Sequence, residues 1–365
     1  MRIPVYQPSL RGREQEYVQE CLATGWISSK GTFVSRFESA FAAYVGSRYA
    51  TAVCNGTVAL HLALVALGVG PGDEVIVPTF TYIASVNAIR YCGATPVFVD
   101  STADTWQLDP QDVRRKLSPR TRAIMAVHLY GHAADLEALR EIASEAGIFL
   151  VEDCAEAFGT LFSGRHVGTF GQLGAFSFFG NKTITTGEGG MVTTDDETLF
   201  DRLVHFKGQG LAKYREYWHD VVGYNYRMTN VAAAIGLAQL ERADELIAQK
   251  IRLAEWYREG LVPLNQVAFH ESDPRVRHTH WMVTILLQDP RDRDPLRQSL
   301  AAAGIETRPT FHPVHGMPPY ADKFQRHPVA ESLGWRGINL PSWPDLSREA
   351  VDQVCSAIRA YFQVH

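Results

Sequence analysis

The sequence predicts an α/β fold built on a mostly parallel sheet, and three features of the chain lead to this prediction. Between residues 50 and 200, short apolar runs alternate with longer stretches of helical periodicity. These runs lack the polar alternation of strands with one face in water, so helices are expected to cover both faces of the sheet. Polar residues and glycines follow several of the runs, and ligands bind at such strand ends.

The predicted elements alternate along the chain. We expect strands at residues 50–54, 74–78, 96–99, 123–127 and 148–151, with helices at 57–67, 81–91 and 136–146. A helical stretch at 230–260 forms a natural bridge to a last part with a strand at 281–287 and helices near 295–303 and 348–362. This order predicts a large α/β domain at residues 31–235 and a smaller α+β domain from residues 1–30 and 236–365.

The composition excludes several classes of protein. Of 365 residues, 46% are hydrophobic and 21% charged, and the net charge of −5 offers no basic surface for nucleic acid or an anionic membrane. The five cysteines are scattered without a C-x-x-C pair, which favours a reducing compartment. The first ten residues lack the apolar centre of a signal peptide, and no apolar run reaches the roughly 18 residues that span a bilayer. We therefore expect a cytoplasmic protein.

Lys182 is the residue that indicates the chemistry most directly. It follows an apolar run and precedes small and hydroxylated residues that end in glycines at 187–190. Lysine condenses with aldehydes to form a Schiff base, and enclosure favours its neutral, nucleophilic form. Pyridoxal 5'-phosphate is the aldehyde cofactor that uses such a lysine. A surface lysine in a loop is the alternative interpretation of Lys182 taken alone.

Other strand ends carry groups that this cofactor needs. Asp153 could pair with the pyridinium nitrogen, although a strand-end aspartate can also cap a turn. Gly56 and Thr57 join a strand to a helix, where backbone amides bind phosphate, although threonine is also an ordinary helix cap. Three further candidates are a stacking ring at Tyr82, a partner for the phenol oxygen at Glu156 and a phosphate contact at Ser177. Together they appear in the chain order of fold-type I pyridoxal phosphate enzymes.

Several longer motifs resemble one family. GWISSKG at 25–31, CNGTVALH at 54–61, EDCAEA at 152–157 and the Lys182 segment are similar to the DegT/StrS-type sugar-nucleotide aminotransferases, over almost the whole chain. YWHD at 217–220, GYNYRMTN at 223–230 and RGINLPSW at 336–343 are most similar to the GDP-perosamine synthases within that family. The resemblance implies the fold-type I architecture and a transaminase.

The resemblance also implies roles for single residues. Lys182 would carry the cofactor covalently, Asp153 would pair with its ring nitrogen and Tyr82 would stack on the ring. Asn225 would reach the phosphate of a neighbouring subunit, which implies a homodimer with shared active sites and leaves a tetramer open. Gly56, Thr57 and Ser177 would hold the phosphate within the chain, while Tyr6, Ser29, Arg308, Phe311, His312 and His315 would contact the substrate.

The implied reaction converts GDP-4-keto-6-deoxymannose and glutamate to GDP-perosamine and 2-oxoglutarate, for O-antigen or another surface polysaccharide. His312 departs from the aromatic residue expected there, and this affects the choice of sugar rather than the chemistry. His312 and His315 could also be metal ligands, but no carboxylate or cysteine lies near them in sequence, so we expect no metal.

Four alternatives remain to be compared with this interpretation. A keto sugar linked to dTDP or UDP would use the same chemistry, and a non-catalytic relative could act as a sensor. A sugar dehydratase of this fold would place a histidine where Lys182 stands. An NAD-linked dehydrogenase would need its glycine-rich loop between a strand and a helix, whereas residues 68–72 follow a helix and precede a strand.

Overall fold

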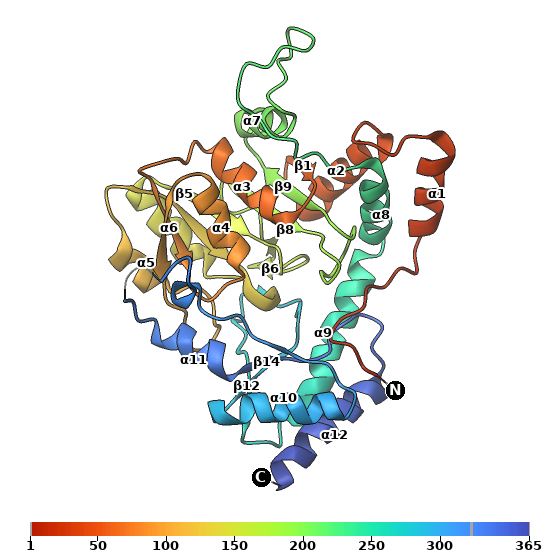
Figure 1. Ribbon diagram of the computed structural model, residues 1–365, viewed down its shortest axis with the longest axis vertical. Coiled ribbons are helices and arrows are strands. Elements are labelled where there is room, and N and C mark those ends of the chain that lie inside the picture. The colour runs from red at the N-terminus through yellow and green to blue at the C-terminus, as the bar shows by residue number, and fades with distance from the viewer. Residues whose placement is uncertain (1, 322–323, 365) are drawn as a thin grey trace.

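The computed structural model describes residues 2–321 and 324–364, and its main feature is a seven-stranded sheet covered by helices on both faces (Figure 1). The strand order is β1-β9-β8-β5-β4-β2-β3, and only β9 runs against its neighbours. This confirms the predicted α/β class with a mostly parallel sheet. The strands are β1 (Tyr49–Val53), β2 (Glu74–Pro78), β3 (Thr95–Val99), β4 (Thr121–Val127), β5 (Phe149–Asp153), β8 (Leu173–Ser177) and β9 (Gly190–Thr194).

Two apolar cores fill the spaces between this sheet and its helices. Every residue of β2 and of β9 is buried, as expected for strands covered on both sides. One core contains side chains of α2 (Thr32–Val45), α5 (Pro110–Lys116), α6 (Leu136–Ala146) and α8 (Asn230–Leu240). The other contains side chains of α3 (Gly56–Ala66), α4 (Ile83–Tyr91) and α7 (Glu197–Lys207). The helices therefore hold the sheet from both faces and leave the ends of its strands open for a site.

A second region lies below the main sheet in Figure 1 and is reached through α9 (Ala243–Leu261). Its own core packs α9 and α12 (Arg348–Val364) against a four-stranded sheet of order β10-β12-β14-β13. The remaining elements are β10 (Val267–Phe269), β12 (Thr284–Leu287), β13 (Arg308–Pro309), β14 (Gly337–Asn339), α10 (Arg293–Ala302) and α11 (Pro328–Arg336). A small sheet of order β11-β6-β7 joins β11 (Val276–Arg277) to β6 (Leu161–Phe162) and β7 (Arg165–His166).

The N-terminal segment contacts both regions. Ile3 pairs with Ile305 and belongs to the core of the lower region. Tyr17 and Cys21 of α1 (Glu14–Thr24) instead pack into the core beside α2 and α8. The division into residues 31–235 and residues 1–30 with 236–365 stays a prediction.

Three details differ from the sequence prediction. The helical stretch at 230–260 is two helices, α8 and α9, separated by a turn at Glu241 and Arg242. The strand expected from Trp281 begins only at Thr284, because the backbone N–H of Trp281 donates to the Tyr130 carbonyl outside the sheet. The helices α1, α2, α5, α7 and α11 were not predicted. No helix within the described residues is long and apolar enough to cross a membrane.

Candidate active site

A cavity of about 540 Å³ opens at the carboxyl ends of β1, β2, β5 and β8. This is the edge at which parallel sheets bind ligands, because loops and helix N-termini meet there. Segments far apart in sequence, from Asn55 to Phe311, line the cavity. Eight predicted site residues lie on its wall: Gly56, Thr57, Tyr82, Asp153, Glu156, Ser177, Lys182 and Phe311.

The start of α3 forms a cradle next to the end of β8. Asn55 caps this helix by accepting a hydrogen bond from the Val58 amide at 3.0 Å. A Cβ atom added to Gly56 would lie 2.6 Å from the Ser177 Cβ and 2.8 Å from its hydroxyl oxygen. Only glycine therefore allows the helix to approach this serine so closely. The N-terminal amides and the two hydroxyls of Thr57 and Ser177 could hold a phosphate.

Asp153 is a buried carboxylate held in a fixed orientation. The Ser85 hydroxyl donates to its Oδ2 at 2.7 Å, and the Ala155 amide donates to Oδ1 at 3.1 Å. Burial raises the pKa of Asp153, whereas these two hydrogen bonds and the positive charge of Lys182 lower it. A cation placed against this carboxylate would stabilise its ionised form.

Lys182 faces an acidic partner and an aromatic ring. Its Nζ lies 3.8 Å from Glu156 Oε1 and 3.9 Å from the centroid of the Trp281 ring. Burial lowers the pKa of Lys182, and burial raises the pKa of Glu156 to about 7. Both shifts favour the neutral members of the pair, and the neutral amine is the nucleophilic form. Glu156 Oε2 is fixed by the Tyr130 amide at 2.9 Å.

Aromatic rings form two sides of the cavity. Tyr82 directly precedes α4. Its side chain is 59% exposed, so its ring is not part of the core. Phe311 lies 5.8 Å from Tyr82 and stacks on Tyr130 at 5.5 Å, and the Trp281 ring continues this series 6.4 Å from Phe311. A flat ligand ring next to Tyr82 would meet an aromatic surface.

The structure distributes the other predicted substrate residues differently. Tyr6 donates its hydroxyl to the Lys182 carbonyl at 2.6 Å, so it contacts the backbone of the site. His315 is buried, with Nδ1 2.7 Å from the Thr79 hydroxyl. His312 instead lines a surface hollow with Arg293 and Arg297. Ser29 and Arg308 do not line the cavity, and Arg308 forms an ion pair with Glu306 at 2.8 Å.

Asn225 lies outside the cavity of its own chain. It is exposed at the base of a loop that projects from the main sheet region beyond α7, the green loop at the top of Figure 1. The same loop exposes large apolar side chains, among them Tyr217 at 92% and Val222 at 88%. The predicted contact of Asn225 with another subunit stays a prediction, and its exposed position is compatible with it.

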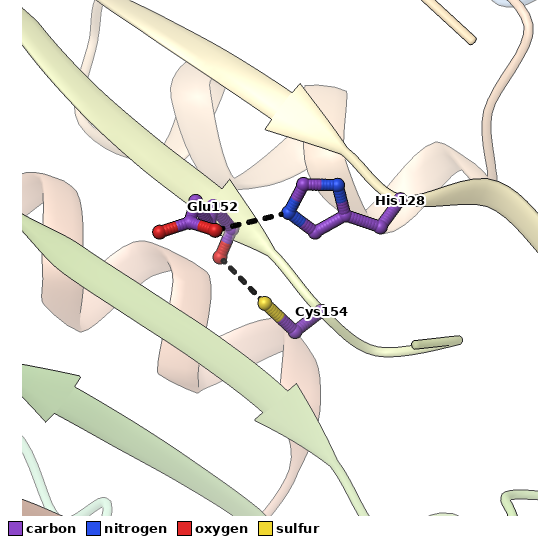
Figure 2. Close-up of side chains that lie close together, drawn as sticks. All are labelled: His128, Glu152 and Cys154. Carbon is purple, nitrogen blue, oxygen red and sulfur yellow. Dashed lines mark hydrogen bonds and ion pairs between the residues drawn. The ribbon is translucent and has the colours of Figure 1, made fainter. Parts of the chain in front are cut away.

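A cluster of His128, Glu152 and Cys154 has potential metal-ligand atoms within 4.8 Å of one another. Figure 2 shows the His128 ring pointing at the Glu152 carboxylate, and His128 Nε2 lies 3.1 Å from Glu152 Oε2. His128 Nδ1 accepts from the Ala134 amide, so the lone pair of that nitrogen is already used. Three backbone amides also donate to Glu152 at 2.7 Å each, from Gly168, Phe170 and Gly171. The cluster is a hydrogen-bond network that fixes the strand carrying Asp153.

Sequence reasoning missed Ser85 and Trp281. Ser85 lies one turn after Tyr82 on α4, and only the packing of α4 against β2 and β3 brings it to Asp153 at the end of β5. Trp281 stood at the start of a predicted strand, which gave no reason to place it beside Lys182. Its position depends on contacts with Tyr130 and with Asn181, whose carbonyl accepts from Trp281 Nε1 at 2.7 Å.

The residues of this cavity fit pyridoxal 5'-phosphate. The glycine cradle beside Ser177 suits the phosphate, and the buried Asp153 suits a protonated ring nitrogen. Lys182, with its lowered pKa, suits an amine that would condense with the aldehyde.

Comparison with known proteins gives the family. The sequence model of the DegT/DnrJ/EryC1/StrS aminotransferase family matches residues 8–359. The chain is 60% identical to a GDP-perosamine synthase of Escherichia coli O157:H7, over 99% of this chain and 98% of that protein. It is 49% identical to a GDP-perosamine synthase of Vibrio cholerae, over 99% of both chains. The crystal structure of DesV from S. venezuelae superposes with a TM-score of 0.91 at 37% identity, covering 96% of this chain and 94% of DesV.

Proposed function

We propose that this chain, which belongs to the DegT/DnrJ/EryC1/StrS aminotransferase family, aminates GDP-4-keto-6-deoxymannose with glutamate. The products would be GDP-perosamine and 2-oxoglutarate. The observation that supports this substrate is the 60% identity over almost the full length to a relative named GDP-perosamine synthase. The GYNYRMTN and RGINLPSW motifs give the same assignment.

The chain is a pyridoxal phosphate-dependent aminotransferase, and its residues have distinct tasks in that chemistry. When bound, the cofactor supplies an aldehyde that accepts an amino group and a ring that takes up electrons from the reacting carbon. The cradle at Gly56, Thr57 and Ser177 would bind its phosphate. Asp153, fixed by Ser85, would hold a proton on the ring nitrogen.

Lys182 is the group that moves protons. Its Nζ would take the proton from the α-carbon of glutamate in the first half of the reaction. In the second half it would deliver a proton to carbon 4 of the sugar. Glu156 lies 3.8 Å from the Lys182 amine. When ionised, it would stabilise the charged form of the amine, and when protonated, it would leave the amine neutral.

A second copy of the chain would complete each site. Asn225 lies on the projecting loop, outside the cavity of its own chain, and the same loop exposes large apolar side chains. These features support a homodimer with shared active sites, and two such dimers could assemble further into a tetramer. We also propose a cytoplasmic location, supported by five free cysteines, and a product used for O-antigen or a related glycan of lipopolysaccharide.

The test is a panel of 4-keto sugar nucleotides linked to GDP, dTDP or UDP, each supplied with glutamate. We expect the GDP sugar to give the highest kcat/KM and a product whose mass shows replacement of the keto oxygen by an amino group. Lys182→Ala is the control for non-enzymatic amination. A dTDP- or UDP-linked sugar with a higher kcat/KM would overturn the assignment of the substrate but not that of the chemistry.

A further inference from the structure

Lys250 is a fully buried lysine outside the cavity. It lies in the middle of α9 with 0% of its surface exposed, and no described carboxylate forms an ion pair with it. Burial lowers its pKa to about 7. A lysine in such a place is costly to the fold unless its donors are used, so its contacts indicate what it does.

The contacts of Lys250 join three segments of the chain. Its Nζ donates to the Trp281 carbonyl at 2.6 Å and also to the Ser342 carbonyl. The same atom lies 5.3 Å from the centroid of the Tyr6 ring. Trp281 precedes β12 and Ser342 follows β14, so both carbonyls lie outside the strands. Among the described residues, Lys250 is the donor that both carbonyls accept from.

Two of these three segments continue directly to Lys182. The Trp281 ring lies against Lys182 Nζ, and its indole N–H donates to the carbonyl of Asn181, the preceding residue. The Tyr6 hydroxyl donates to the carbonyl of Lys182 itself. A single buried amine therefore contacts Trp281 and lies near Tyr6, two residues that in turn contact Lys182.

We propose that Lys250 is a positioning residue of the transamination site, which holds the Trp281 indole over Lys182 by binding the carbonyls of Trp281 and Ser342. Without these two hydrogen bonds the backbone at Trp281 loses its anchor to α9, and the indole can move away from the amine. The inference depends on the aminotransferase chemistry of the family and not on the identity of the sugar.

The nearest charged or titratable neighbours do not provide another reason for this lysine. His280 is the imidazole that interacts with Lys250, and burial lowers its pKa to about 3, so it stays neutral. The phenol of Tyr6 is directed to Lys182 and not to Lys250. The hydrogen bonds to the two carbonyls therefore account for the buried position of Lys250.

The test compares Lys250→Met with Tyr257→Phe. Tyr257 lies two turns further along α9, is also fully buried, and donates to the carbonyl of Pro341, next to Ser342. Tyr257→Phe thus removes a buried hydrogen bond to the same loop without touching Trp281 or Lys182. Lys250→Met keeps the length of the side chain and removes its donors.

The main readout is the rate at which cofactor-free protein captures added pyridoxal phosphate at Lys182, followed by the visible absorption band. We expect Lys250→Met to slow capture about tenfold, because displaced groups around the reacting amine slow its reaction. Tyr257→Phe should change the rate of capture by less than about twofold while lowering the melting temperature to a similar extent. The visible circular dichroism of the loaded protein should change in Lys250→Met only, because it reports the geometry around the bound chromophore.

A double-mutant cycle with Trp281→Phe separates positioning from general stability. If Lys250 acts through the indole, Lys250→Met should have little further effect on capture when Trp281 is already Phe. An undiminished effect in the Trp281→Phe background would overturn the proposal, as would equal slowing by Lys250→Met and Tyr257→Phe. If Lys250→Met does not fold, Lys250→Leu, which also removes the donors, serves in the same cycle with the same outcomes.

Discussion

The two sides of the active-site cavity are built in different ways. We call Gly56, Thr57, Asp153, Ser177 and Lys182 the sheet-edge wall, and Trp281 with Phe311 the C-terminal wall. Residues of the sheet-edge wall follow the ends of parallel strands, so the sheet itself determines where they meet. The C-terminal wall comes from loops beside a different sheet, and its rings are held by contacts with Tyr130, Asn181 and Lys250.

We expect the sheet-edge wall to perform the chemistry and the C-terminal wall to adjust its rate. The sheet-edge wall offers charged and hydrogen-bonding groups at fixed positions. The C-terminal wall offers aromatic surface whose exact placement depends on packing. Substitutions in the first wall should therefore remove steps of the reaction, whereas substitutions in the second should change rates by smaller factors.

Lys182→Ala tests the sheet-edge wall with the largest expected effect. Without the amine no group takes the proton from the donor carbon, so kcat should fall at least about a thousandfold. The purified wild-type protein should be yellow, and glutamate should bleach its lysine-linked band. The variant should lack this band while still binding pyridoxal phosphate. A wild-type protein that gains no band with added cofactor would contradict the assignment of Lys182.

Asp153→Asn should leave binding largely intact and lower kcat on the order of a hundredfold, because an amide cannot hold a proton on the ring nitrogen. Steady-state kinetics together with a cofactor titration separate the two effects. Ser85→Ala, which removes one hydrogen bond to the same carboxylate, should have a smaller effect in the same direction. Turnover close to that of the wild type in Asp153→Asn would make Asp153 a structural cap.

Gly56→Ala tests the cradle of the sheet-edge wall. The added methyl group meets the Ser177 side chain at 2.6 Å, and such overpacking costs about 1–3 kcal/mol. The dissociation constant of pyridoxal phosphate should rise at least about tenfold in an equilibrium titration. Gly70→Ala is the matched control, since its methyl group meets nothing within 4 Å. Equal affinities in the two variants would mean that the cradle does not bind the phosphate.

Trp281→Phe tests the C-terminal wall. A phenyl ring keeps aromatic surface near Lys182 but loses the indole N–H bond to the Asn181 carbonyl and part of the cation–π attraction. That attraction is worth about 1–2 kcal/mol in a desolvated site, so kcat/KM should fall by about tenfold at most. A loss as large as that of Asp153→Asn would mean that the two walls are equally important for the chemistry.

Glu156→Gln should change how the stability of the protein depends on pH. Burial raises the pKa of Glu156 to about 7, so the folded protein binds this proton more tightly than the unfolded chain does. Its contribution to stability is full below the unfolded pKa, near 4.5, and is lost as the pH rises to about 7. Melting temperatures of cofactor-free protein at pH 5 and pH 7.5 should therefore differ less in the variant. Glu255→Gln, at an exposed position of α9, should leave the difference unchanged.

The sheet, the strand ends and the chemical groups at those ends can be predicted from the sequence alone. Short apolar runs with helices between them permit few arrangements other than a covered parallel sheet, and Asp153 and Lys182 follow such runs directly. The tertiary structure decided the rest. It placed Trp281 against Lys182, Ser85 against Asp153 and Lys250 beneath the Trp281 carbonyl, and it turned His312 into a separate hollow. The physical reason is distance along the chain, because side-chain contacts between remote segments depend on how whole layers pack and leave no periodic pattern in the sequence.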